Sequence, residues 1–216
     1  MGPELPSYGA HAGYRFAMAT VHLIRHGEVF NPNHVVYADL NGFNLSPTGV
    51  LQAHAAGKHL ADHEIDVVLS SPLARARQTA TAVARHHGLE PVIAGDLTET
   101  RQYPLWTGQR WDDLDQLFPG QVDRYLADAS VLDDVEETIA AVAARVVGAI
   151  EGAISKGADS VVVVGHQDPT QAARLLMTKR SLSELLFDPP KHASITTLVG
   201  SHRSWTEQAV WAAPNS

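Results

Sequence analysis

The chain has 216 residues, with 16 basic against 24 acidic side chains and a formal net charge of −8. This acidic balance disfavours a general nucleic-acid or anionic-membrane surface, and the hydrophobic content of 44% is that of a globular protein. The absence of cysteine excludes disulfides, thiolate nucleophiles and sulfur-ligated zinc. A length near 200 residues predicts one domain with a single sizeable core.

The N-terminal segment differs from the rest of the chain. Residues 1–17 mix glycine, proline, tyrosine and scattered charge, without the apolar core of a secretory signal. We expect 1–17 to be a leader or a disordered arm and 18–216 to form the folded domain. The most apolar later stretch, 139–150, contains Arg145 and is too short to span a bilayer. The expected location is therefore the cytoplasm.

Short apolar runs rich in β-branched residues predict the strands. Residues 21–24, 67–70 and 161–164 are typical of buried parallel strands, and a helix-like stretch follows each of them. Residues 194–199 and 205–210 are typical of two closing strands.

Helix signals alternate with these strands. A first helix begins at Ser46 as N-cap and Pro47 as first residue, carries an apolar stripe of Val50, Ala53, Gly57 and Leu60, and ends near residue 62. Apolar spacing predicts further helices over 71–88, 134–155, 169–177 and 182–187. The alternation predicts an α/β fold, a three-layer α/β/α sandwich with a mostly parallel sheet.

The residues that follow the strands carry the functional signal, because ligands of open α/β sheets bind beyond the carboxyl ends of the strands. Arg25 and His26 follow the first strand, Arg75 comes shortly after the second, and His166 follows the strand at 161–164. Each residue alone is compatible with a surface ion pair or a core histidine. Two arginines and two histidines at one sheet edge are instead suited to a phosphate dianion.

Missing motifs narrow the chemistry. The sequence has no GxxxxGK[ST], GxGxxG, GxSxG or HExxH pattern, which argues against nucleotide cradles, serine hydrolases and zincins. A histidine flanked by Arg25 and Gly27 suits a nucleophile that attacks phosphorus in line, with the glycine allowing a ligand to approach the backbone.

Several motifs together carry a family resemblance. They are RHGE at 25–28, LSPTG at 45–49, SSPLARARQTA at 70–80, LTE at 97–99, WTG at 106–108 and GH at 165–166. In this order and spacing, the chain resembles the histidine phosphatase superfamily, the phosphoglycerate mutase-like proteins, from residue 21 to about residue 200. RHG alone is a weak pattern, but its combination with the second motif and the late histidine is specific.

The resemblance implies roles for five residues. His26 would be the nucleophile that forms a phosphohistidine, and Arg25, Arg75 and His166 would bind the phosphoryl oxygens. Glu99 matches the family's proton donor to the leaving oxygen, with a solvated loop carboxylate as the alternative. These roles are chemically consistent, because positive donors stabilise the phosphoryl transition state and a carboxylic acid protonates an alkoxide. Neither a metal ion nor a cofactor is expected.

Four further positions are expected to contact substrate: Gly27, Asn31, Gly165 and Gln167. The family often places an asparagine seven residues after the motif arginine, but Pro32 stands there, between Asn31 and Asn33. We favour Asn31. Gly165 replaces a family serine or threonine, and Gln167 stands where glycine is common, so the pocket edge is expected to differ.

The resulting hypothesis is a metal-independent phosphomonoesterase, a histidine acid-type hydrolase acting on a small phosphorylated metabolite. A phosphoglycerate mutase, a protein phosphohistidine phosphatase and a non-catalytic phosphate-binding module are the alternatives. Mutases of the family are longer and carry Trp-Asn after RHG, which residues 29–32 lack. Nucleic-acid and membrane partners are not expected, and a homodimer is left open.

Other residues give weaker signals. His59 and His63 have metal-capable spacing on the first helix, but together with His54 they favour a solvated face. Aromatic residues in two long loops favour a partly apolar pocket for the leaving group, and two loop arginines could bind a second anion; these residues are Tyr37, Phe43, Tyr103, Trp106, Trp111, Arg101 and Arg110.

Overall fold

One six-stranded sheet organises the computed structural model, which describes residues 18–100, 102–201 and 204–213. The strand order is β3-β2-β4-β1-β5-β6. The first four strands in this order are parallel, and β5 and β6 are antiparallel, which confirms a mostly parallel sheet. The strands are β1 (Ala19–Arg25), β2 (Val67–Ser70), β3 (Val92–Ile93), β4 (Ser160–Gly165), β5 (Ile195–Ser201) and β6 (Ser204–Trp211).

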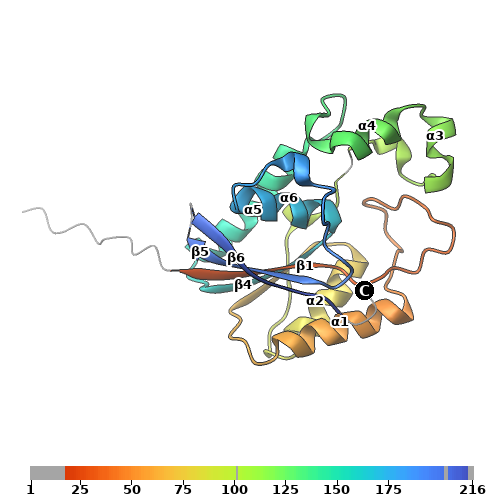
Figure 1. Cartoon of the computed structure of the whole chain (residues 1–216). Coiled ribbons are helices and arrows are strands. Elements are labelled where there is room, and N and C mark those ends of the chain that lie inside the picture. Colours follow the sequence, from red (N-terminus) through yellow and green to blue (C-terminus); the bar gives the residue numbers. More distant parts are fainter. Residues whose placement is uncertain (1–17, 101, 202–203, 214–216) are drawn as a thin grey trace, which may run out of the picture.

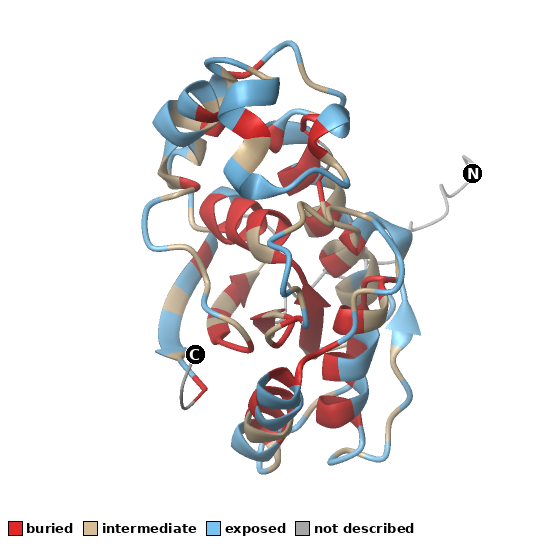
Figure 2. Cartoon of the chain, turned by 90° about the vertical axis from the view of Figure 1, so that its right-hand side faces the viewer, coloured by how far each residue is buried: buried red, intermediate tan, exposed pale blue. Residues whose placement is uncertain are grey.

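Helices cover both faces of this sheet, which confirms the three-layer α/β/α architecture (Figure 1). On one face lie α1 (Pro47–Leu60) and α2 (Ala74–Ala84), and on the other lie α5 (Ile139–Ser155) and α6 (Gln167–Met177). Figure 2 shows the central strands buried and the outward sides of the outer helices exposed. None of the helices within the described ranges is long and apolar enough to cross a membrane.

The valine-rich strands supply both cores because successive side chains of a strand point to opposite faces. Val161 and Val163 of β4 pack with α5 and α6 through residues such as Val146. Val162 and Val164 pack on the other face with α1 and α2. Burial on both faces explains why these strands are continuous apolar runs.

The first helix begins where the sequence predicts. Ser46 is the N-cap, and its Oγ accepts a hydrogen bond from the backbone N of Gly49 at 2.9 Å, while Pro47 occupies the first turn. The predicted apolar stripe needs one correction. Val50 is 41% exposed, and Ala56 is buried toward the sheet instead.

Other helix boundaries differ from the prediction. The second helix begins at Ala74 rather than at residue 71. The helix predicted from residue 134 begins only at Ile139, because Thr138 is its N-cap and its Oγ1 accepts from the backbone N of Ala141. The helix predicted from residue 169 already begins at Gln167. The predicted last helix is a single 3₁₀ turn, Leu182–Glu184.

The largest difference is a helical segment where the sequence predicts a long loop. Residues 102–132, here called the helical insertion, contain α3 (Leu114–Leu117) and α4 (Gln121–Asp128) together with 3₁₀ turns. Its apolar side chains form a core of their own against α5 and α6, away from the sheet (Figure 1); they are Tyr103, Trp106, Leu114, Val122, Ala129 and Leu132. The signal was missed because the helices are short and Gly120, with φ of 77°, separates them.

Candidate active site

Neighbouring strand ends bring the two motif histidines together. Arg25 of β1 pairs with Gly165 of β4, and the backbone N of His26 donates to the Gly165 carbonyl at 3.0 Å. The ring centroids of His26 and His166 are consequently 5.2 Å apart. Arg75, from the first turn of α2, donates from Nε to Nδ1 of His166 at 3.3 Å. These residues, called the phosphoryl centre below, are His26, Arg75 and His166.

The protonation state and tautomer of His26 follow from its surroundings. Its Nδ1 lies 2.7 Å from the Gly27 carbonyl oxygen, so Nδ1 carries the proton and donates it there. Within the described part of the chain no hydrogen bond engages Nε2, so its lone pair is available. Burial, reinforced by the charge of Arg75, holds the pKa of His26 well below its usual range. A neutral ring with one available lone pair is the form that a nucleophile requires.

His166 is also neutral, and both of its ring nitrogens are hydrogen-bonded. Burial and the neighbouring His26 lower the pKa of His166 well below its ordinary value. Because Nδ1 accepts from Arg75, Nε2 carries the proton and donates to Ser71 Oγ at 2.8 Å. The ring is therefore fixed as a donor on its Nε2 side.

Both arginines keep a buried nitrogen without a hydrogen-bond partner among the described residues. In Arg75 this atom is Nη1, while Nη2 donates to the carbonyl of Ala38. In Arg25 it is Nε, while Nη1 donates to Gln167 Oε1 at 2.8 Å and to the carbonyl of Pro190. Buried polar groups are normally paired, so these donors indicate room for an anion.

Glu99 lies in a wall of the same site. Burial and then the charge of Asp168 raise its pKa to about 8, although Arg75 and Arg25 oppose the shift. The backbone N of Thr100 donates to its Oε1 at 2.9 Å. Glu99 is therefore protonated at neutral pH and able to donate a proton.

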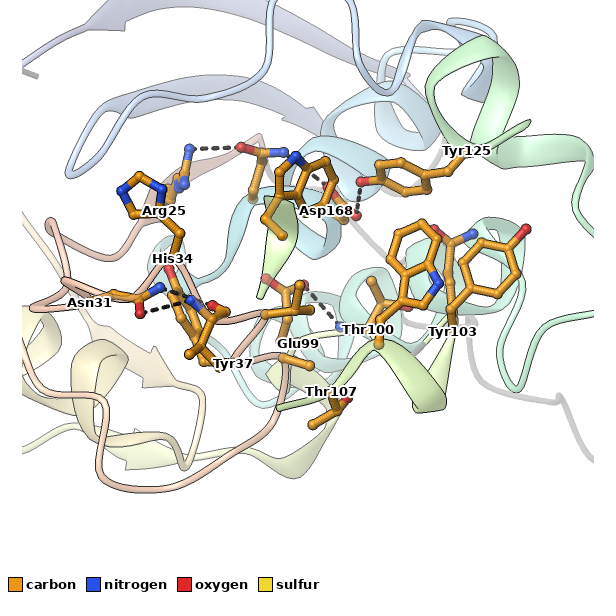
Figure 3. Close-up of a pocket in the computed structure, with 17 residues that line it drawn as sticks. Arg25, Asn31, His34, Tyr37, Glu99, Thr100, Tyr103, Thr107, Tyr125 and Asp168 are labelled. Carbon is orange, nitrogen blue, oxygen red and sulfur yellow. Dashed lines mark hydrogen bonds between the residues drawn. The ribbon is translucent and has the colours of Figure 1, made fainter. Parts of the chain in front are cut away.

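Figure 3 shows a pocket of about 450 Å³, which Tyr37 connects to the phosphoryl centre because it lines the pocket and also contacts Arg75 and His26. Arg25, Glu99, Gln167 and Asp168 line it on the side of the sheet, and aromatic side chains from the loop before α1 and from the helical insertion line the rest: Tyr37, Tyr103, Trp106, Trp111 and Tyr125. Its size is suited to a small metabolite.

The loop before α1 covers the phosphoryl centre. The ring of Tyr37 lies over the guanidinium of Arg75, 4.6 Å from its carbon, and 6.5 Å from the ring of His26. The carbonyl of Ala38, in the same loop, accepts a hydrogen bond from Nη2 of Arg75. His26 is only 1% exposed as a result.

The expected substrate contacts are placed as follows. Gln167 lines the pocket and binds Arg25. Asn31 also lines the pocket, but its amide spans the loop, with Nδ2 donating to the Val35 carbonyl and Oδ1 accepting from the Val35 N. Asn33 is exposed. The choice of Asn31 as a phosphate contact stays a prediction.

Gly27 has a packing role that the sequence did not indicate. A Cβ at this position would lie 2.5 Å from the carbonyl oxygen of Gly49, at the start of α1. The close approach of the two backbones therefore requires glycine here. Contacts of Gly27 and Gly165 with substrate stay predictions.

Sequence reasoning missed Asp168 and Tyr125. Tyr125 of α4 donates from its hydroxyl to Asp168 Oδ2 at 2.9 Å, and Gln167 Nε2 donates to Oδ1 at 3.3 Å. Burial raises the pKa of both groups. The position of Asp168, two residues after His166, was an available signal, whereas nothing in the sequence links Tyr125 to the site. His192, whose ring is 5.9 Å from that of His26, was also missed.

The weaker candidates lie elsewhere. His59 stacks on Trp211 with centroids 4.6 Å apart, and His63 packs edge-on against the buried His22. Arg110 pairs with Asp112 at 3.3 Å on an exposed surface. Arg101 lies outside the described residues.

The fold and this site define a class: an α/β protein whose strand ends place two neutral histidines between two arginines. The family model of the histidine phosphatase superfamily (branch 1) matches residues 21–212, and the chain belongs to that superfamily.

Curated relatives and solved structures agree with this family assignment. The uncharacterized protein Rv0525 of Mycobacterium tuberculosis is 35% identical over 184 residues, which are 83% of this chain and 89% of the relative. Phosphoserine phosphatase 1 of Hydrogenobacter thermophilus is 30% identical over 158 residues, 72% of this chain and 74% of that protein. The structure of mycobacterial glucosyl-3-phosphoglycerate phosphatase in complex with VO3 superposes with a TM-score of 0.80 at 26% identity, covering 91% of this chain and 100% of that one.

Proposed function

We propose that the chain is a metal-independent phosphomonoesterase that acts through a phosphohistidine at His26. The observation that carries the proposal is the neutral His26 ring, whose Nδ1–H is held by the Gly27 carbonyl while Arg75 and His166 stand beside it. Relatives and structural neighbours that are phosphatases support it.

The first half-reaction phosphorylates the enzyme. Nε2 of His26 attacks phosphorus as the bond to the ester oxygen breaks, and the nitrogen–phosphorus bond forms with the electron pair of Nε2. The unpartnered nitrogens of Arg25 and Arg75 stabilise the charge on the equatorial oxygens, and the Nε2–H of His166 joins them by exchanging its bond to Ser71 Oγ for one to the phosphoryl group. Glu99 gives its proton to the leaving oxygen, which departs as an alcohol.

The second half-reaction restores the enzyme. Glu99, now ionised, takes a proton from a water molecule, and the water oxygen attacks the phosphorus of phospho-His26. The nitrogen–phosphorus bond breaks, its electron pair returns to Nε2, and inorganic phosphate leaves. Each step uses only side chains of this chain and water.

The proposed substrate class is a small phosphorylated metabolite. A pocket of about 450 Å³ supports it, and the net charge of −8 disfavours polyanionic partners. Two relatives are named for phosphoserine and for glucosyl-3-phosphoglycerate, both small phosphate esters.

Phosphate release from p-nitrophenyl phosphate tests the proposal, at mildly acidic and neutral pH, with and without EDTA. We expect EDTA-resistant turnover that His26→Ala lowers by about 10⁴-fold or more. The matched control is His86→Ala, which removes an exposed histidine at the end of α2. Quenching of wild type in alkali during turnover should trap a base-stable, acid-labile phosphoprotein that His26→Ala lacks.

Three outcomes would contradict the proposal. Activity abolished by EDTA would indicate a metal-dependent enzyme. Full activity of His26→Ala would show that His26 is not the nucleophile. Conversion of 3-phosphoglycerate to 2-phosphoglycerate without phosphate release would indicate a mutase.

A further inference from the structure

One part of the pocket is not used by the proposed chemistry. It is formed by Thr100 and by Gln102 and Thr107 of the helical insertion. In Figure 3, Thr100 and Thr107 lie on the opposite side of Glu99 from Arg25. The phosphate therefore belongs at the Arg25 side, and the ester's leaving group extends toward the threonines.

Four polar atoms of this part and of the adjoining Tyr103 are buried and have no hydrogen-bond partner among the described residues. They are Thr100 Oγ1, Gln102 Oε1, Tyr103 Oη and Thr107 Oγ1. The Nε2 of Gln102 is fixed by the carbonyl of Ala129 at 3.1 Å, so its Oε1 is held in one place as an acceptor. Leaving a buried polar atom unpaired is costly, and four such atoms in one pocket indicate that a ligand completes the bonding.

Aromatic rings stand beside these atoms. Tyr103 stacks on Trp106 with centroids 4.5 Å apart, and Trp111 meets Trp106 edge-on at 6.0 Å. Trp106 Nε1 already donates to Gln121 Oε1 at 2.9 Å, so the indole offers the ligand its ring rather than its N–H. These rings supply apolar contact for the carbon–hydrogen face of a ligand.

The described residues that line the pocket offer little positive charge to a second anion at this end. Among the described lining residues, only Arg25 and His34 can carry positive charge. Arg25 is bonded to Gln167 and Pro190, and His34 pairs with Asp112 at 3.8 Å on an exposed surface. The unpartnered atoms are three hydroxyl oxygens and an amide oxygen, which accept hydrogen bonds from a neutral donor. A ligand hydroxyl both donates and accepts hydrogen bonds, and fits each of them.

We propose that Thr100, Gln102 and Thr107, with the rings of Tyr103 and Trp106, form a hydroxyl subsite that binds a neutral, sugar-like leaving group. Ligand hydroxyls bond to Thr100 Oγ1, Gln102 Oε1 and Thr107 Oγ1, and the carbon–hydrogen face of the ligand packs on the aromatic rings. The inference rests on the proposed function, since it names the substrate class of the same site.

Two phosphate esters of matched shape test the subsite. Glucose 6-phosphate and cyclohexylmethyl phosphate both carry a six-membered ring on a CH₂–O–phosphate arm, but only the first has ring hydroxyls. We expect kcat/KM for the sugar to exceed that for the cyclohexyl ester by about 10²-fold, from a few uncharged hydrogen bonds. Thr100→Val keeps the shape and removes one hydroxyl, so it should lower this ratio about 5- to 10-fold.

Thr206→Val is the matched control, because Thr206 is exposed on β6 and outside the pocket. In Thr206→Val, the ratio of kcat/KM for glucose 6-phosphate to that for the cyclohexyl ester should keep its wild-type value. Equal kcat/KM for the two esters would overturn the inference. So would a higher kcat/KM for phosphoethanolamine or for 3-phosphoglycerate, which would indicate a cationic or an anionic leaving group.

Equilibrium binding separates this inference from the proposed function. His26→Ala cannot form the phosphohistidine, and calorimetry should still show tighter binding of glucose 6-phosphate than of cyclohexylmethyl phosphate. If wild type hydrolyses neither ester but this preference is present, the subsite stands and the proposed function falls. If wild type hydrolyses the esters but His26→Ala binds both equally, the proposed function stands and the subsite falls.

Discussion

The phosphoryl centre and the helical insertion are built in different ways, although they meet in one site. His26, Arg75 and His166 follow strands of the sheet, and the pairing of β1 with β4 sets their spacing. The pocket wall formed by residues 102–132 has its own apolar core, packs on α5 and α6, and pairs with the loop after β1 through a bridge between Val35 and Arg110. The chemistry is thus fixed by the sheet register, while the shape of the pocket depends on a segment that can vary separately.

This comparison predicts that a substitution in the phosphoryl centre lowers kcat by a similar factor for every substrate. Arg75→Met removes a buried guanidinium next to His166, and we expect kcat to fall about 10³-fold for both p-nitrophenyl phosphate and an alkyl phosphate. Steady-state kinetics on the two esters checks it. Arg77→Met, on the exposed side of the same helix, is the control. A loss confined to one ester would show that Arg75 acts on the leaving group.

Glu99 lies between the two regions, and the loss of activity on replacing it should depend on the leaving group. Glu99→Gln removes the proton that an alkoxide needs, so phosphorylation by an alkyl phosphate should slow about 10²-fold. The loss should be smaller for p-nitrophenyl phosphate, because p-nitrophenolate leaves more readily without a proton. Rapid-quench measurement of phosphoenzyme formation with both esters compares the two losses. Equal losses would assign Glu99 to binding rather than to proton transfer.

The different construction also explains what the sequence could predict. The strands are continuous valine-rich runs, and the residues after them carry a specific motif set, so the sheet and the positions of His26, Arg75 and His166 follow from sequence. The carbonyl that orients His26 does not, because it belongs to the backbone of Gly27. The bond from Tyr125 to Asp168 joins α4 to α6, 43 positions apart, and no local pattern encodes such a contact.

The helical insertion was missed for a related reason. Its helices are too short to show a clear period, and they are stabilised by packing against Ile139 and Val142 of α5 rather than by their own propensity. Trp106 and Tyr103 were correctly singled out as pocket residues, since both line the pocket. Their aromatic character was visible in sequence, but the arrangement around Thr100 and Gln102 was not.

Asp168 connects the insertion to the proton donor, which gives a pH test. Glu99 must be protonated to act in the first half-reaction, so kcat/KM falls as pH rises through its pKa of about 8. Asp168→Asn removes a negative charge that favours the protonated form, and the alkaline limb of kcat/KM should move to lower pH by roughly one unit. The other groups that face Glu99 are Arg25, Arg75, Tyr37 and Tyr125, and they stay in place.

The control for this profile is Asp115→Asn, which removes an exposed acid from α3. Its alkaline limb should coincide with that of wild type. If the limb of Asp168→Asn also coincides with wild type, the raised pKa of Glu99 comes from burial alone, and the charge of Asp168 has no effect on the chemistry.

The smallest expected effect concerns how firmly the insertion is attached. Tyr125→Phe removes the hydroxyl that donates to Asp168 but keeps the ring that packs against Trp106. A lost hydrogen bond to a charged group costs about 2 kcal/mol, and the cost should appear as local opening of α4 rather than of the sheet. Hydrogen exchange should therefore accelerate in Gln121–Asp128 and stay unchanged in β1 and β4. Equal acceleration in both would mean that insertion and sheet open as one unit, and the separation drawn between the two regions would not hold.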